Sequence, residues 1–82
     1  MKLELRYVKA IMKNLEAEPT GDNLVGEEIE VLDTIEDTEV ARLVFASNGF
    51  DIDGKLNQIT YRGYDIEKKC LFVISAIRVQ AK

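Results

Sequence analysis

Histidine and tryptophan are absent from this chain of 82 residues, and cysteine and proline occur once each. Without histidine, no Ser-His-Asp triad or Cys-His pair can form, and no imidazole can bind a metal. A single cysteine makes neither an internal disulfide nor a four-cysteine zinc site. These absences exclude most of the common nucleophilic and metal-dependent chemistries.

Phosphate-binding loops are missing as well. The segment from Gly21 to Gly26 lacks the Lys-Ser/Thr ending of a P-loop. A chain of 82 residues forms one domain, because two halves would each be too small to build a core. One such domain has little room for a catalytic cleft. We therefore expect a noncatalytic protein without a cofactor, organised as a single domain over residues 1–82.

Long apolar runs are also scarce. The longest, from Cys70 to Ile77, is far shorter than the roughly 20 residues that span a membrane. The N-terminal residues show no apolar stretch followed by a small-residue cleavage site. Because a single thiol suits a reducing compartment, we expect a cytoplasmic protein with no membrane partner, and Cys70 as a small buried hydrophobe.

Charge is abundant but unevenly distributed. The formal net charge is −4, yet residues 14–41 contain ten acidic residues and no basic one. Residues 1–13 carry four basic residues and one acidic residue. An asymmetry of this kind bears on partners and association rates rather than on the fold.

The acidic segment predicts a surface that docks on a basic region of a larger protein. Glu28 and Glu30 alternate with apolar residues, a pattern typical of a half-buried strand. Such a strand holds the two carboxylates about 7 Å apart on one face, close to the spacing of successive phosphates. The predicted partner-binding residues are Glu27, Glu28, Glu30, Asp33, Glu36, Asp37 and Glu39.

This surface defines a class of partner. A small acidic protein can imitate a phosphate backbone and occupy the nucleic-acid site of its target, in the manner of viral or plasmid-encoded counter-defence inhibitors. The same charge repels polyanions at long range, so we expect no direct binding of nucleic acid. The hypothesis is a protein-interaction module, an inhibitor or adaptor, whose partner is a protein with a basic surface.

The expected fold class is α+β, with a small antiparallel sheet. Its strands are predicted near residues 27–33, 56–62 and 70–80. A helix is expected over residues 2–17 and a second, shorter helix over residues 37–47. A turn-forming cluster around Pro19 separates the N-terminal element from the rest of the chain.

The N-terminal helix is predicted from charge periodicity. At 100° per residue, the basic side chains of this segment fall within one arc of about 60°, with apolar side chains on the other side. A strand over Leu3, Leu5 and Tyr7 is the rival interpretation, since these residues also alternate with charged ones. The basic residues in question are Lys2, Arg6, Lys9 and Lys13.

The second helix has both a start and a stop signal. Thr34 or Asp37 can cap its N-terminus, and Asn48-Gly49 supplies the stop. A strand over residues 40–46 competes with it, because β-branched and aromatic residues there favour sheet. The expected buried stripe of the helix consists of Val40, Leu43 and Val44.

The predicted strand over residues 70–80 is apolar on both faces. This pattern indicates a central strand covered on both sides, or a strand at an interface. A structural homo-oligomer that hides the second face is therefore an alternative function. One face carries Leu71, Val73, Ile77 and Val79, and the other carries Phe72, Ile74 and Ala76.

Two short motifs, one rich in aspartate and one containing two tyrosines, each resemble a known local pattern. Asp51 and Asp53, followed by Gly54, resemble part of a calcium-binding loop, although no glutamate stands where the bidentate ligand belongs. Asp-Gly also encodes a tight turn, so a turn and a weak calcium site are the two interpretations. The run Tyr61 to Tyr64 is predicted as a turn flanked by strand aromatics, and the segment Gly63 to Lys69 is predicted as a loop of hairpin size.

Overall fold

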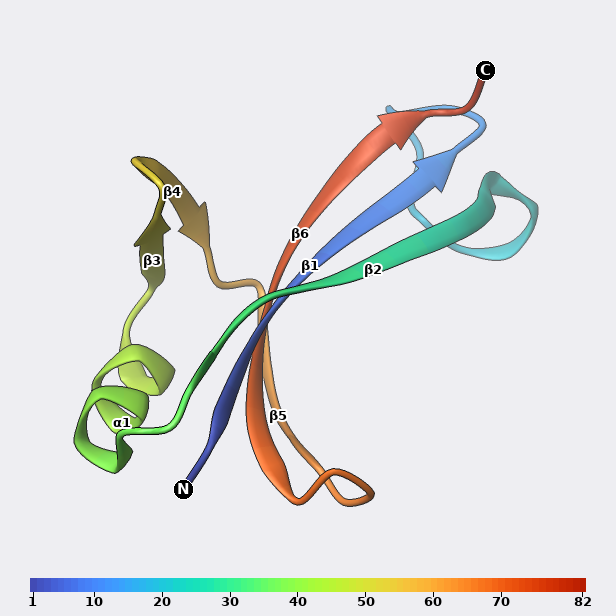
Figure 1. Cartoon of the computed structure of the whole chain (residues 1–82). Coiled ribbons are helices and arrows are strands. Elements are labelled where there is room, and N and C mark those ends of the chain that lie inside the picture. The colour runs from blue at the N-terminus through green and yellow to red at the C-terminus, as the bar shows by residue number, and fades with distance from the viewer.

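A long central strand organises the computed structural model, which describes residues 1–82. β1 (Leu3–Met12) pairs antiparallel with β2 (Leu24–Ile35) and parallel with β6 (Cys70–Gln80). β5 (Tyr61–Asp65) pairs antiparallel with β6, which gives a four-stranded sheet of order β2-β1-β6-β5 (Figure 1). The fold is α+β with a largely antiparallel sheet, and the β1–β6 pair is its parallel exception.

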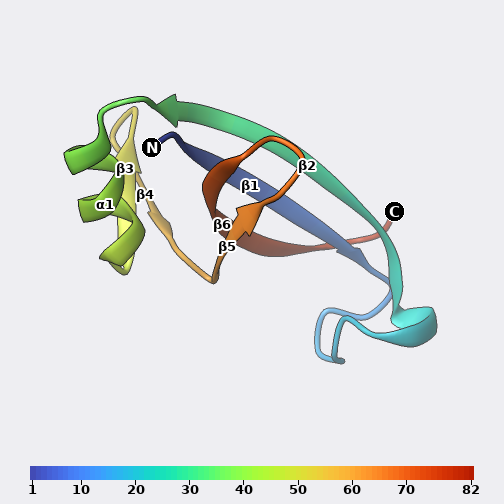
Figure 2. The ribbon, with the colours of Figure 1, turned by 90° about the horizontal axis from the view of Figure 1, so that it is seen from below.

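A smaller layer packs on one end of this sheet. It consists of α1 (Thr38–Ala46) and a hairpin of β3 (Gly49–Ile52) and β4 (Lys55–Gln58). Viewed from below, α1 and the hairpin lie beside the N-terminus, at the end opposite the loop between β1 and β2 (Figure 2). That loop contains a short 3₁₀ helix, η1 (Gly21–Asn23).

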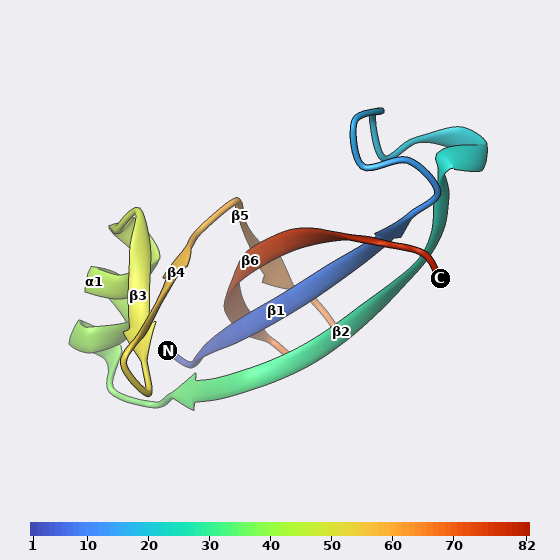
Figure 3. The same cartoon turned by 90° about the horizontal axis from the view of Figure 1, so that it is seen from above.

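The two faces of the sheet differ in what covers them. Leu3 and Leu5 of β1 and Val73 of β6 are buried on one face, where they pack with Ala41 of α1 and Phe50 of β3. We call this side the helix face. The opposite side, called the open face, has no helix or hairpin packed on it, and most of the long strands extend beyond the α1 layer (Figure 3).

The predicted N-terminal helix is wrong, because residues 3–12 form strand β1. Hydrogen bonding to strands on both sides outweighs the helical preference of this segment. The strand interpretation over Leu3, Leu5 and Tyr7 was the correct rival. The expected basic stripe is absent, since Arg6 and Lys9 lie on opposite faces of an alternating strand.

The predicted strand over residues 27–33 is confirmed and extends to Leu24–Ile35, but it is not half-buried as expected, because residues 27–31 are all exposed. The strand over residues 70–80 is confirmed with the same bounds and the expected division of faces. The strand over residues 56–62 is wrong, because it is divided between β4 and β5 in two different sheets. The buried side chain of Ile59 lies at this break, where its N–H donates to the carbonyl of Asn48.

The predicted second helix over residues 37–47 is confirmed by α1 and its caps. Asp37 accepts a hydrogen bond from the backbone N–H of Val40 at 3.0 Å and is the N-cap. The predicted buried stripe is right only at Val44, because Val40 and Leu43 are exposed. The helix docks through a neighbouring stripe made by Ala41, Val44 and Phe45.

Arg62 of β5 connects the sheet to the end of α1. Its Nε donates to the carbonyl of Phe45 at 2.6 Å, and its terminal nitrogen donates to the carbonyl of Ser47. The last carbonyls of a helix lack partners within the helix and carry partial negative charge. A cation held against them therefore stabilises the docking of α1 on the sheet.

Replacing Arg62 by glutamine should lower the free energy of unfolding by about 1–2 kcal/mol, because α1 loses charge-assisted hydrogen bonds at its C-terminus. Urea denaturation followed by circular dichroism measures the change. Arg42→Gln is the matched control, since Arg42 is exposed on the same helix and makes no side-chain hydrogen bond. Equal losses in the two variants would contradict the capping role of Arg62.

Candidate protein-interaction surface

The predicted acidic residues lie along β2 and the start of α1. All seven are exposed, and none of them forms an ion pair. Asp37 caps α1, and Asp33 accepts a hydrogen bond from the N–H of Thr34 at 2.7 Å. Five carboxylates remain without a hydrogen-bond partner within the protein. We call Glu27, Glu28, Glu30, Glu36 and Glu39 the free carboxylates.

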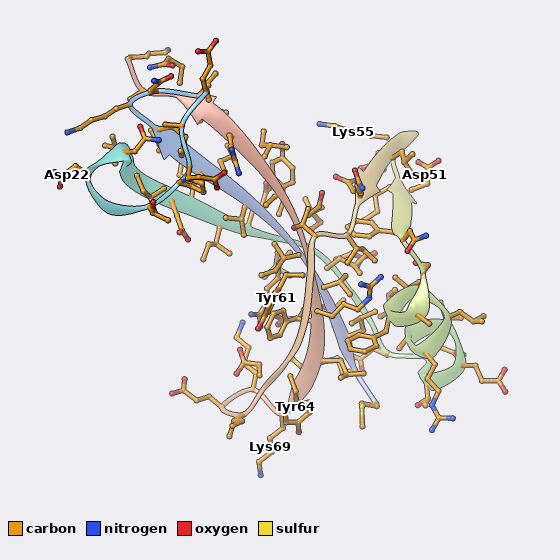
Figure 4. All side chains as sticks on the ribbon, turned by 180° about the vertical axis from the view of Figure 1, so that it is seen from behind. Asp22, Asp51, Lys55, Tyr61, Tyr64 and Lys69 are labelled. Atoms are coloured by element: carbon orange, nitrogen blue, oxygen red, sulfur yellow. The ribbon has the colours of Figure 1, made fainter.

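The acidic segment does not form one patch. Asp22 lies at the far end of the molecule from Asp51 and Lys55 of the hairpin (Figure 4). Glu28 and Glu30 stand opposite Lys9 and Tyr7 of β1 and share the helix face, as predicted. Glu27 instead lies on the open face, so the free carboxylates line both sides of β2.

A groove adjoins the acidic strand on the helix face. It lies between β2, α1 and β3, has a volume of ≈ 390 Å³, and is lined mainly by apolar side chains. The carboxylates of Asp33 and Asp51 stand among these apolar groups. The sequence pattern placed Asp51 only in a turn or a weak calcium site, because nothing in the chain order places it across a groove from β2. The apolar lining comprises Leu5, Ile35, Leu43, Val44, Phe50 and Ile52.

The Asp53-Gly54 pair forms a turn. Both residues have positive φ, +53° and +75°, and they connect the paired residues Ile52 and Lys55 of the hairpin. A two-residue hairpin with positive φ at both central positions is the type I′ turn that Asp-Gly favours. The turn interpretation of this motif therefore matches the geometry. No three acidic or cysteine side chains in the structure converge as a metal site.

The open face contains an ionic network that the sequence did not reveal. Arg6 donates from Nε to Glu4 at 2.9 Å and from its terminal nitrogen to Asp65 at 2.8 Å. Lys68 adds a contact to Glu4 at 3.3 Å. Glu4 is only 7% exposed. Because β6 separates β1 from β5 in the sheet, this network links β1 to β5 across β6.

Phe72 forms the floor of this network. The guanidinium carbon of Arg6 lies 4.2 Å from the centre of the Phe72 ring, a cation–π distance. A Cβ atom at Gly63 would lie 2.5 Å from the same ring, so a larger residue there would displace the ring. The predicted turn over Tyr61 to Tyr64 is wrong, since these residues belong to β5. The only sequence pattern that pointed to the ionic network was a pair of opposite charges two residues apart, Glu4 and Arg6.

The network shifts the pKa values of its members. Burial by itself raises the pKa of Glu4, but hydrogen bonds and attraction from Arg6 and Lys68 outweigh it and lower the pKa below 4.5. The backbone N–H of Lys68, and then Arg6, lower the pKa of Asp65 below 3.8. Arg6 loses solvation on burial, yet Asp65 and Glu4 raise its pKa above the ordinary value.

Glu4 and Asp65 should make the fold sensitive to acid. Their folded-state pKa values are lowered, so the unfolded chain binds more protons and stability rises with pH in this window. This stabilisation is complete above the unfolded-state values of 4.5 and 3.8 and is lost as the pH falls through the lower folded-state values. We expect the melting temperature, measured by calorimetry, to decrease below about pH 4.5.

Glu4→Gln should lower the melting temperature at neutral pH and weaken its decrease in acid, because one titrating group of the network is removed. Glu67→Gln is the control, since Glu67 is exposed and makes no side-chain contact to a cation. If the melting temperature of Glu4→Gln decreased with falling pH in parallel with that of the wild type, Glu4 would be excluded as a source of the acid sensitivity.

An uncovered apolar area lies beside the network. Val8 of β1 stands between Ile29 of β2 and Ala76 of β6, and in the next row Val31 and Ile74 stand on either side of Arg6. We call the five apolar residues the open-face patch. Ile29 is 65% exposed and Val31 is 45% exposed. Exposed apolar side chains grouped on one face are typical of an interaction surface.

The function has to be inferred from this geometry, because comparisons with known proteins found no match. No family model matches the chain, and no curated protein or solved structure is detectably similar to it. None of its helical segments has the length and apolar character needed to cross a membrane. Cys70 is fully buried, as expected for a small hydrophobe.

Proposed function

We propose that this chain is a noncatalytic, cytoplasmic protein-interaction module that docks on the basic, nucleic-acid-binding surface of a larger protein. It would act as an inhibitor or adaptor, in the manner of viral or plasmid-encoded counter-defence proteins. One observation carries the proposal: three of the free carboxylates, Glu27, Glu28 and Glu30, lie on the edge strand β2, and the same strand borders an apolar groove.

The charges would act mainly on the encounter. Exposed carboxylates without intramolecular partners contribute little to the fold, yet their summed field steers a basic partner and raises the association rate. The field is screened beyond about 8–10 Å at physiological salt, so the docking should weaken as salt is added. Glu28 and Glu30 share one face at the spacing of successive phosphates, which suits a surface that normally binds nucleic acid.

The groove would supply the lifetime of the complex. Its apolar lining includes Leu43, which is 73% exposed and has no partner to cover it. Apolar contacts in a groove reduce dissociation, whereas charges at the rim mainly accelerate association. A lysine or arginine side chain fits both features, because its aliphatic part can pack on the floor while its cation meets Asp33 or Asp51.

Charge reversal tests the proposal. Tagged wild-type protein should retain a specific partner from a lysate of the source cells at low salt. The double variant Glu28→Lys/Glu30→Lys should bind that partner at least tenfold more weakly at low salt, and the difference should shrink at high salt. Surface-immobilised binding measurements at the two salt concentrations provide the affinities.

The control reverses charge elsewhere. Glu16→Lys/Glu67→Lys changes the net charge by the same amount at exposed positions outside β2. It should leave the affinity within about twofold of the wild type, since only local charges act strongly at short screening lengths. Similar affinities for the two double variants would show that net charge, and not the β2 surface, governs binding.

A homo-oligomer is the second candidate function, and the open-face patch favours it. An interface of ordinary size takes about 800 Å² from each partner. The patch would need the neighbouring Tyr61, which is 59% exposed, to approach that area. Two such faces would then pack as a sandwich of sheets.

Light scattering over a range of concentrations tests this candidate. A dimer formed by the open face should show twice the monomer mass at high concentration, and Ile29→Lys should abolish the increase because it buries a charge. Leu56→Lys is the matched control, since Leu56 is 74% exposed on the hairpin away from the patch. A constant monomer mass in the wild type would reject the candidate.

A further inference from the structure

β2 is an unpaired edge of the sheet. It stands last in the strand order and pairs only with β1. Between two register irregularities, residues 26–31 pair regularly with residues 6–11 of β1. Residues 27–31 are all exposed. The outer side of this regular segment therefore presents backbone N–H and C=O groups that no strand of this chain satisfies.

The edge has two of the devices that block strand addition, acidic side chains and register irregularities, but the irregularities lie at the two ends of residues 26–31 and leave that segment regular. Proteins also protect edges with lysine, proline, very short strands or covering loops. β2 contains no lysine and no proline and is 12 residues long. The other edge strand, β5, has only five residues, and its Arg62 extends to the end of α1. β2 is thus the edge that remains open to a further strand.

A second copy of this chain is a poor occupant. Two β2 strands paired antiparallel about Ile29 would oppose Glu28 of one copy to Glu30 of the other. Like charges directly opposite each other destabilise a pair of strands. The occupant that fits carries cations at these positions, because opposite charges across strands are favourable.

We infer that β2 accepts an extended segment of the partner as a fifth strand of the sheet. The segment alternates basic and apolar residues. Its basic side chains lie beside Glu28 and Glu30 on the helix face, and its apolar side chains lie beside Ile29 and Val31, where they enlarge the open-face patch. Backbone hydrogen bonds supply affinity and the alternation supplies specificity. The inference rests on the proposed function, since it defines the part of the basic partner that makes contact.

Two synthetic peptides of one composition test the inference. One alternates lysine with valine or isoleucine over seven residues, and its isomer groups the lysines at one end. The alternating peptide should bind at least tenfold more tightly, because only its order places all cations on one side of a strand. Fluorescence anisotropy with labelled peptides gives the affinities.

Amide hydrogen exchange locates the bound peptide. Amides of a strand point alternately to its two sides, so every second amide within residues 27–31 should exchange at least tenfold more slowly with the alternating peptide bound. Glu28→Gln/Glu30→Gln should weaken this peptide at least fivefold. The matched control, Glu36→Gln/Glu39→Gln, changes two free carboxylates beyond the strand and should leave its affinity within twofold.

Equal affinities for the two peptides, or binding without slower exchange in β2, would overturn strand addition. Neither result would affect the charge-dependent capture of the natural partner, which is measured separately. If charge reversal in β2 left that capture unchanged, the proposed function would fail whatever the peptides did. Weaker capture together with alternate protection of the β2 amides would support both.

Discussion

The pairing of β1 with strands on both of its sides is the constraint on which the rest of the structure depends. The first and last strands of the chain lie next to each other in parallel, so everything between residues 13 and 69 must form the connection between them. The same pairing buries Leu3 and Leu5 and gives α1 and the hairpin a surface on which to pack. It also leaves β2 as an edge.

The two faces of the sheet are stabilised by different interactions. On the helix face, apolar burial and the capping of α1 by Arg62 hold the smaller layer in place. On the open face, no second layer packs on the sheet. Arg6 instead covers part of this face by stacking on Phe72 and binding Glu4 and Asp65. Arg6 satisfies carboxylates that would otherwise be costly to bury. Apolar side chains of the open face that Arg6 does not cover remain exposed.

The proposed interactions all converge on β2 for one physical reason. An edge strand offers its backbone, and its alternating side chains reach both faces of the sheet at once. Here one face of β2 carries carboxylates beside an apolar groove, and the other carries part of the open-face patch. A basic, extended partner could engage all three features, whereas a polyanion or a second β2 strand would meet like charge.

Sequence periodicity by itself determined those helices and strands whose tertiary surroundings suit the conformation that their local sequence favours. The strand over residues 70–80, the helix capped by Asp37 and the alternation of Glu28 and Glu30 belong to this group. Composition likewise determined the excess of acids. Tertiary structure decided that β1 is a strand, because its pairing partners are distant in the chain and its periodicity also suited a helix. It also decided which acids remain unpaired and that Asp51 lines the same groove as Asp33 of β2, since the proximity of remote residues leaves no local pattern.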